Sequence, residues 1–152
     1  MWRWLHPYAK PEATYNLLQK LLPWFVALTL VTLITGVIWG LAFAPGDYQQ
    51  GDSYRIIFLH VPAAIFSMGA YMGMAIMGGI ALIWQIKTAE WAIPAIAPVG
   101  AALTIVALLT GAIWGKPMWG TWWVWDARLT SELILLFLYL GFMALQNAIE
   151  DR

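Results

Sequence analysis

The sequence has 152 residues, of which 62% are hydrophobic and 11% are charged. Soluble domains usually carry about a quarter charged residues, so this composition predicts an integral membrane protein. The absence of Cys excludes disulfides, thiolate metal sites and a catalytic cysteine, and the lack of a basic patch argues against a nucleic-acid partner.

Four apolar runs are long enough to cross a lipid bilayer, which takes roughly 20 residues. The first has Pro23 in its first turn, the third is interrupted near its start by Pro94 and Pro98, and the fourth is uncharged beyond Glu132. We therefore expect an all-α, polytopic membrane protein in which residues 1–152 form a single transmembrane domain. The four spans are expected at residues 21–44, 56–86, 91–115 and 130–149.

The connections and their charges predict the orientation. A Pro45-Gly46-Asp47 turn follows the first span, and residues 87–90 are expected to form a tight link between the second and third. Lys and Arg favour the cytoplasmic side of a membrane. Both termini and residue 87 are predicted on the same side of the membrane, and this side carries more Lys and Arg residues than the other. We expect this side to be cytoplasmic: its charges are Arg3, Lys10, Lys20, Lys87 and Arg152, against Arg55, Lys116 and Arg128.

An internal repeat supports this topology. Residues 29–40 align with residues 104–115, and eight of the twelve positions are identical. Such a repeat is typical of a duplicated helical hairpin in parallel orientation. It pairs Trp39 with Trp114, so both are expected at the non-cytoplasmic boundary. The paired glycines of each copy stand four residues apart, a spacing that lets membrane helices pack closely.

Residues 114–130 form a Trp-rich segment that contains five of the eleven tryptophans: Trp114, Trp119, Trp122, Trp123 and Trp125. Tryptophan favours membrane–water boundaries, so an anchoring belt is one interpretation. Five in one loop favour the alternative, a surface for a large flat ligand. Trp119, Trp122, Trp123 and Asp126 are spaced i, i+3, i+4 and i+7, which predicts one amphipathic stripe along the membrane surface if the segment is helical.

His60 is the candidate metal ligand. It lies near the start of the second span, on the same predicted face as the Trp-rich segment, whereas His6 lies on the opposite face and is unrelated. Ionisable groups at membrane depth mark functional sites, and a neutral imidazole is a good axial ligand for haem iron. The alternative is a histidine hydrogen-bonded to a nearby carbonyl. A methionine ligand is conceivable, although core packing is favoured for the methionines at positions 68, 72, 74 and 77 of this span.

Charged residues beside the Trp-rich segment suit the acidic groups of a porphyrin. Arg55 and Arg128 flank the segment and can bind a carboxylate through two hydrogen bonds, and Lys116 is a weaker third candidate. Other roles remain open for these residues. Asp126 can cap the fourth helix, and Arg128 can extend to the interface or pair with Asp126 or Glu132.

Residues 119–130, which contain Trp-Trp-Val-Trp-Asp, resemble the WWD signature of the haem-handling proteins of cytochrome c biogenesis. With Phe58-Leu-His60-Val-Pro62 and the duplicated Thr-Gly-x-Ile-Trp-Gly, the sequence is similar to CcmC, the haem exporter protein C family, along essentially its whole length. In that family haem lies at the periplasmic face beneath the WWD segment, between two axial histidines, in a bundle of about six helices. His60 matches the first histidine. No histidine follows it, so the resemblance implies a chain truncated on its C-terminal side.

The resemblance implies a multi-pass protein of the bacterial inner membrane that binds haem b as cargo and presents it to the haem chaperone CcmE. Its partners would be the ATPase CcmA and the membrane subunits CcmB and CcmD. No nucleophile is evident, which favours a positioning platform over an enzyme. The alternatives are a haem lyase for apocytochrome c, an electron-transfer cytochrome b, and a structural or translocating transporter subunit. The expected haem-binding residues are His60 as axial ligand, Trp114, Trp119, Trp122, Trp123, Trp125, Asp126, Arg128 and Arg55.

Overall fold

The computed structural model describes residues 10–150, and this part of the chain is helical apart from short connections. His6, Arg3 and Arg152 lie outside the described residues. Four helices in the described range are long and apolar enough to cross a membrane, which confirms the all-α, polytopic fold class. The elements are α1 (Pro11–Ile38), the π-helical turn η2 (Trp39–Phe43), the 3-10 turn η3 (Asp52–Ile56), α2 (Ile57–Trp84), α3 (Lys87–Trp119) and α4 (Ala127–Glu150).

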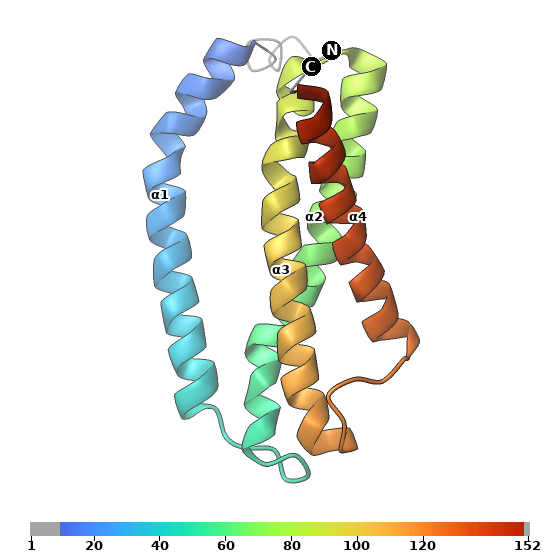
Figure 1. Ribbon diagram of the computed structural model, residues 1–152. Coiled ribbons are helices and arrows are strands. Elements are labelled where there is room, and N and C mark those ends of the chain that lie inside the picture. The colour runs from blue at the N-terminus through green and yellow to red at the C-terminus, as the bar shows by residue number, and fades with distance from the viewer. Residues whose placement is uncertain (1–9, 151–152) are drawn as a thin grey trace.

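Helix α3 is the centre of the bundle. Figure 1 shows α2 and α4 beside α3, whereas α1 stands apart from them along most of its length. The buried residues of α3 are all Ala, Gly or Thr, and small residues of this kind let membrane helices approach closely. None of the residues of α1 is buried, so its apolar surface faces outwards.

The start of α1, the end of α4 and the α2–α3 connection lie at one end of the bundle (Figure 1). The loops at residues 44–51 and 120–126 lie at the other end, which we call the loop end. Helices α1 and α3 run in the same direction, as the internal repeat predicts. The repeat copies therefore both finish at the loop end, one in η2 and the other near the end of α3.

The helix limits correct two expectations from the sequence. Residues 87–90 form the first turn of α3 rather than a link, and the connection consists of Gln85 and Ile86. Helix α1 begins at Pro11, so Pro23 lies in the helix interior rather than in the first turn. Hydropathy marks the apolar stretch of a span, but the helical backbone continues past it into the interface, where charged side chains reach water.

Tyr139 is the largest buried side chain of the described bundle and joins three helices. Its hydroxyl, on α4, donates a hydrogen bond to the Ser67 carbonyl of α2 over 2.7 Å. Its ring meets the ring of Tyr71 edge-on, with centroids 5.4 Å apart. On the α3 side the ring packs against Gly100, where a side chain would overlap it. This packing fixes the relative positions of α2, α3 and α4, whose side chains form the cavity described next.

Candidate functional site

A cavity of about 470 Å³ lies between α2, α3 and α4 and reaches the loop end. Volumes of this size are typical of small-molecule sites. From α2 it is lined by His60, Ala64 and Met68, which follow one helix face over about 12 Å at 1.5 Å per residue. Polar side chains from the two loops and the start of α4 line it as well, among them Gln50, Asp126 and Arg128. The cavity is therefore polar at the loop end and mostly apolar along its helical walls, where His60, Ser131 and Glu132 are the polar exceptions.

The hydrogen bonds of His60 fix its tautomer. Its Nδ1 atom lies 3.0 Å from the carbonyl oxygen of Ala107 and 3.1 Å from the hydroxyl oxygen of Thr110, both on α3. A carbonyl only accepts hydrogen bonds, and the Thr110 hydroxyl donates to the Val106 carbonyl over 2.6 Å. Nδ1 therefore carries a hydrogen and donates it, so in the neutral imidazole the lone pair is on Nε2. Metal-binding histidines commonly donate the hydrogen of their other ring nitrogen in this way.

Trp114 completes the surroundings of His60 at the loop end. Its indole meets the imidazole edge-on, with ring centroids 5.8 Å apart, and its Nε1 donates a 2.9 Å hydrogen bond to the side-chain oxygen of Gln50. The Asp47 carboxylate accepts the backbone N–H groups of residues 49 and 50, which holds Gln50 in place. The sequence analysis missed Gln50. Its turn is visible in Pro45-Gly46-Asp47, but nothing in the sequence reveals that its side chain reaches Trp114.

Gly111 leaves the space that the imidazole occupies. A Cβ atom at this position would lie 3.0 Å from Cε1 and 3.4 Å from Nδ1 of His60. The equivalent glycine of the first repeat copy, Gly36, has nothing within 4 Å of such an atom. The same repeat position is therefore close-packed in α3 and open in α1.

This contrast predicts different effects for two matched substitutions. Gly111→Ala should push the imidazole away from α3 and weaken any ligand bound through His60 by roughly ten-fold, the lower end of the range for groups that orient a metal ligand. Gly36→Ala should leave binding unchanged. Absorbance titration with haem measures both, and equal affinities for the two variants would show that Gly111 does not position His60.

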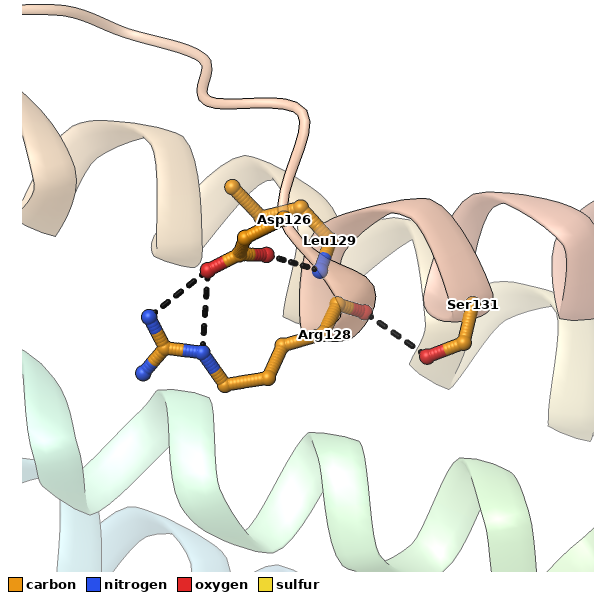
Figure 2. A network of polar contacts seen from close by, with 4 residues as sticks. All are labelled: Asp126, Arg128, Leu129 and Ser131. Carbon is orange, nitrogen blue, oxygen red and sulfur yellow. Dashed lines mark hydrogen bonds and ion pairs between the residues drawn. The ribbon is translucent and has the colours of Figure 1, made fainter.

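Asp126 holds both the start of α4 and the side chain of Arg128 (Figure 2). One carboxylate oxygen accepts the backbone N–H of Leu129 over 2.9 Å, which caps the helix. The other accepts from Nε and Nη2 of Arg128 over 3.0 and 2.7 Å. The Leu129 N–H, and after it the Arg128 side chain, lower the pKa of Asp126 below its ordinary value. The structure thus contains both the cap and the Arg128 pairing that the sequence left open.

Arg128 also covers the ring of Trp119, with its guanidinium carbon 5.5 Å from the ring centroid. Both residues line the cavity. The side chain is 77% exposed, so its charge remains accessible while Asp126 and Trp119 hold its position. A cation held over an aromatic face at a cavity mouth suits an acidic group of a flat ligand.

The Trp-rich segment is not one amphipathic helix, so the stripe that was expected for a helical segment does not form. Helix α3 ends at Trp119, because Gly120 adopts a φ of 74° that favours glycine, and residues 120–126 are not helical. Trp114 and Trp119 line the cavity from α3. Trp122 lies under Lys116, and Trp123 meets Trp125 edge-on with centroids 5.4 Å apart. The five tryptophans therefore divide into a cavity pair and a loop trio.

The loop trio contains an unusual buried group. The Nε1 atom of Trp123 is buried and has no hydrogen-bond partner within the described residues. The ring of Trp125 is 76% exposed. The trio thus has an unused hydrogen-bond donor next to a large exposed aromatic surface.

Arg55 and Lys116 occupy structural positions in this conformation. Arg55 donates from Nε to the Ala44 carbonyl over 2.9 Å and from Nη1 to the Leu41 carbonyl over 3.3 Å, so it satisfies the backbone at the end of η2. Lys116 donates to the Gly120 carbonyl over 2.9 Å at the end of α3. Of the three cations considered from the sequence, Arg128 is the one that lines the cavity.

Glu132 lines the cavity from α4 and was not among the residues expected there. Its Oε1 atom accepts a 2.7 Å hydrogen bond from the hydroxyl of Ser67 on α2. The sequence signal was available, since a carboxylate stands within an otherwise apolar span. Within residues 10–150 no group of three His, Asp or Glu side chains is placed to hold a metal ion. A single histidine on a cavity wall can ligate a metal that brings other ligands of its own, as a porphyrin does.

Comparisons with known proteins point to one family. Residues 4–152 match the family model described as heme exporter protein C. The sequence is 64% identical to heme exporter protein C of Haemophilus influenzae and 59% identical to that of Escherichia coli strain K12. Each alignment covers 152 residues, which is 100% of this chain and 62% of the relative. The protein of that name from Paracoccus denitrificans is 49% identical over 144 residues. The chain thus spans about three fifths of the length of the curated relatives it matches.

Proposed function

The chain belongs to the heme exporter protein C family, and on this premise we propose that it binds haem b at the loop end of the bundle and presents it to the haem chaperone CcmE during cytochrome c biogenesis. The observation that carries this proposal is the hydrogen bond of His60 on the wall of the cavity. Its Nδ1 donates to the Ala107 carbonyl, so the neutral imidazole has its lone pair on Nε2. Neutral imidazole is the form that ligates haem iron.

The rest of the cavity fits the remaining parts of haem. Trp114 and Trp119 supply aromatic surface for the porphyrin, and Arg128 supplies a cation for its propionates. Helical walls of Ala64, Leu108 and other apolar residues suit the hydrophobic edge. We assign Trp122, Trp123 and Trp125 to contacts at the outer side of the site, and Arg55 to a propionate contact that requires it to leave the end of η2.

The cavity, the arrangement of the helices and the family of the chain also support a proposal about where the protein lies and what it works with. We propose that the protein lies in the bacterial inner membrane with its loop end in the periplasm and works with CcmA, CcmB and CcmD. In this proposal it acts as a platform that positions haem. The chain has no native Cys, so single-cysteine labelling at Thr121 tests the orientation directly. Labelling of this position from the cytoplasmic side would contradict it.

Two tryptophan substitutions test the haem-binding role and separate haem retention from haem transfer to the chaperone. Trp119→Ala removes a cavity wall and should lower haem retention by about ten-fold, a loss of about 1.4 kcal/mol, the upper part of the range for one aromatic contact. Trp125→Ala removes a side chain that is 76% exposed and should leave haem retention unchanged while slowing transfer to the chaperone.

Haem absorbance after purification measures retention, and the yield of haem-loaded chaperone measures transfer. Membrane abundance of each variant is the control, because a tryptophan that merely anchors the fold would reduce it. Undiminished haem retention and transfer in both variants would contradict the proposed role of the Trp-rich segment.

A further inference from the structure

Glu132 is an acidic side chain in the second turn of a membrane-spanning helix. It is half-buried and lines the cavity on the α4 side. Ionisable groups in this position are costly for a membrane protein, and they mark functional sites. Ion pairing within the fold does not explain it. The ion pairs of the described residues join Arg55 to Asp52 and Arg128 to Asp126.

The surroundings of Glu132 hold its side chain in place. Its Oε1 atom accepts from the hydroxyl of Ser67, a fully buried residue of α2 that also contacts the Ala64 carbonyl over 2.8 Å. The α3 wall of the cavity presents no Lys or Arg. Arg128 lines the same cavity, but its guanidinium is bound to Asp126. Among the described residues, the cavity thus contains a carboxyl group that has no Lys or Arg bound to it.

We propose that Glu132 makes the cavity prefer a metal–porphyrin whose core is positively charged, and hence ferric over ferrous haem. This inference depends on the proposed function, since it takes His60 as the ligand of the iron. A ferric porphyrin core carries one positive charge and a ferrous core carries none. Charge interactions are strong in a low-dielectric cavity, so the carboxylate attracts the ferric core and has little effect on the neutral one. Glu132 is a specificity-determining residue that acts through charge, without ligating the iron.

Gallium(III) and zinc(II) protoporphyrin IX provide the test, because both are redox-inert, both accept an axial ligand, and their cores differ by one charge. Absorbance titration of the purified protein gives the affinity for each. Glu132→Gln is expected to weaken gallium binding by about ten-fold and to change zinc binding by less than about two-fold. Glutamine has the same shape and keeps an acceptor for Ser67, so circular dichroism should show the helical content of the wild type.

Two controls separate charge from structure. Ser67→Ala removes the hydrogen bond but keeps the carboxylate, so the gallium-to-zinc affinity ratio should stay close to that of the wild type. Glu90→Gln removes a carboxylate from the first turn of α3, at the opposite end of the bundle, and should not alter the ratio. In a second measurement, the midpoint potential of bound haem should be higher in Glu132→Gln than in the wild type.

The outcomes are distinct. A ten-fold fall for gallium alone, with a raised haem potential, supports the inference. Equal changes for both metals, no change for either, or a Ser67→Ala effect as large as that of Glu132→Gln would overturn it. If the wild type binds neither porphyrin in a His60-dependent manner, the proposed function fails as well. If it binds both in that manner and only the Glu132 effect is missing, this inference alone fails.

Discussion

Replacement of His60 by alanine is expected to abolish the Soret shift that haem undergoes on binding, and to weaken binding on the order of 100-fold or more. The imidazole supplies the lone pair, and even the loss of groups that merely orient a metal ligand costs about 10–100-fold. No other cavity side chain on α2 can replace it, because Met68 lies about 12 Å further along the helix at 1.5 Å per residue. A titration followed by absorbance measures both the shift and the affinity.

Added imidazole should partly restore the spectrum of this variant, since it can fill the vacated position beside α3. His6→Ala is the matched control, because it removes the other histidine of the sequence and should leave the spectrum intact. An unchanged spectrum and affinity in His60→Ala would remove His60 from the site. Its hydrogen bond to the Ala107 carbonyl would then be its whole role.

Gly100→Ala is expected to destabilise the bundle more than any other glycine-to-alanine change in α3. The added methyl group would overlap the ring of Tyr139, which is 0% exposed and has no room to turn aside. Overpacking of this kind costs about 1–3 kcal/mol. Displacement of the ring also threatens the hydrogen bond to the Ser67 carbonyl, which contributes about 1 kcal/mol. Thermal unfolding in detergent, followed by circular dichroism, should show a clearly lowered midpoint.

Two other glycines provide controls for this effect. Gly73 on α2 and Gly141 on α4 have nothing within 4 Å of an added Cβ atom. Alanine at either position should be neutral or slightly stabilising, because alanine favours a helix over glycine by about 0.5–1 kcal/mol. A Gly100→Ala midpoint equal to those of the two controls would show that Tyr139 is not tightly enclosed.

The helical fold was predictable because the thickness of the bilayer and the hydropathy of the sequence together determine which segments cross the membrane. The ends of the helices were less predictable. Hydropathy does not reveal that a helix continues beyond its apolar stretch into the interface. The starts of α1 at Pro11 and of α3 at Lys87 were therefore not predicted. The stripe expected through Trp122 and Asp126 failed because the positive φ of Gly120 ends the helix first. A glycine directly after a predicted helix is a known stop signal, and here it ends the helix despite the spacing pattern.

The candidate site was predictable only where a residue type was unusual for its place. A histidine and an arginine near the ends of apolar runs identified His60 and Arg128, and both line the cavity. Arg55 has the same sequence signature but satisfies the carbonyls at the end of η2. Gln50 and Ser67 are ordinary residues in ordinary surroundings. Their roles follow from the way the helices are turned towards each other, which the sequence of one chain does not reveal.

Asp126 has two roles, as the cap of α4 and as the partner of Arg128, and neither asparagine nor glutamate can fill both. Asparagine would keep an oxygen for the Leu129 N–H but lose the charge that holds Arg128. Glutamate would keep the charge, but its longer side chain places the oxygens too far out to cap the first turn of α4. Only aspartate both caps α4 and pairs with Arg128. If one of these roles alone mattered, asparagine or glutamate could replace Asp126; because both matter, we expect neither to be tolerated at this position.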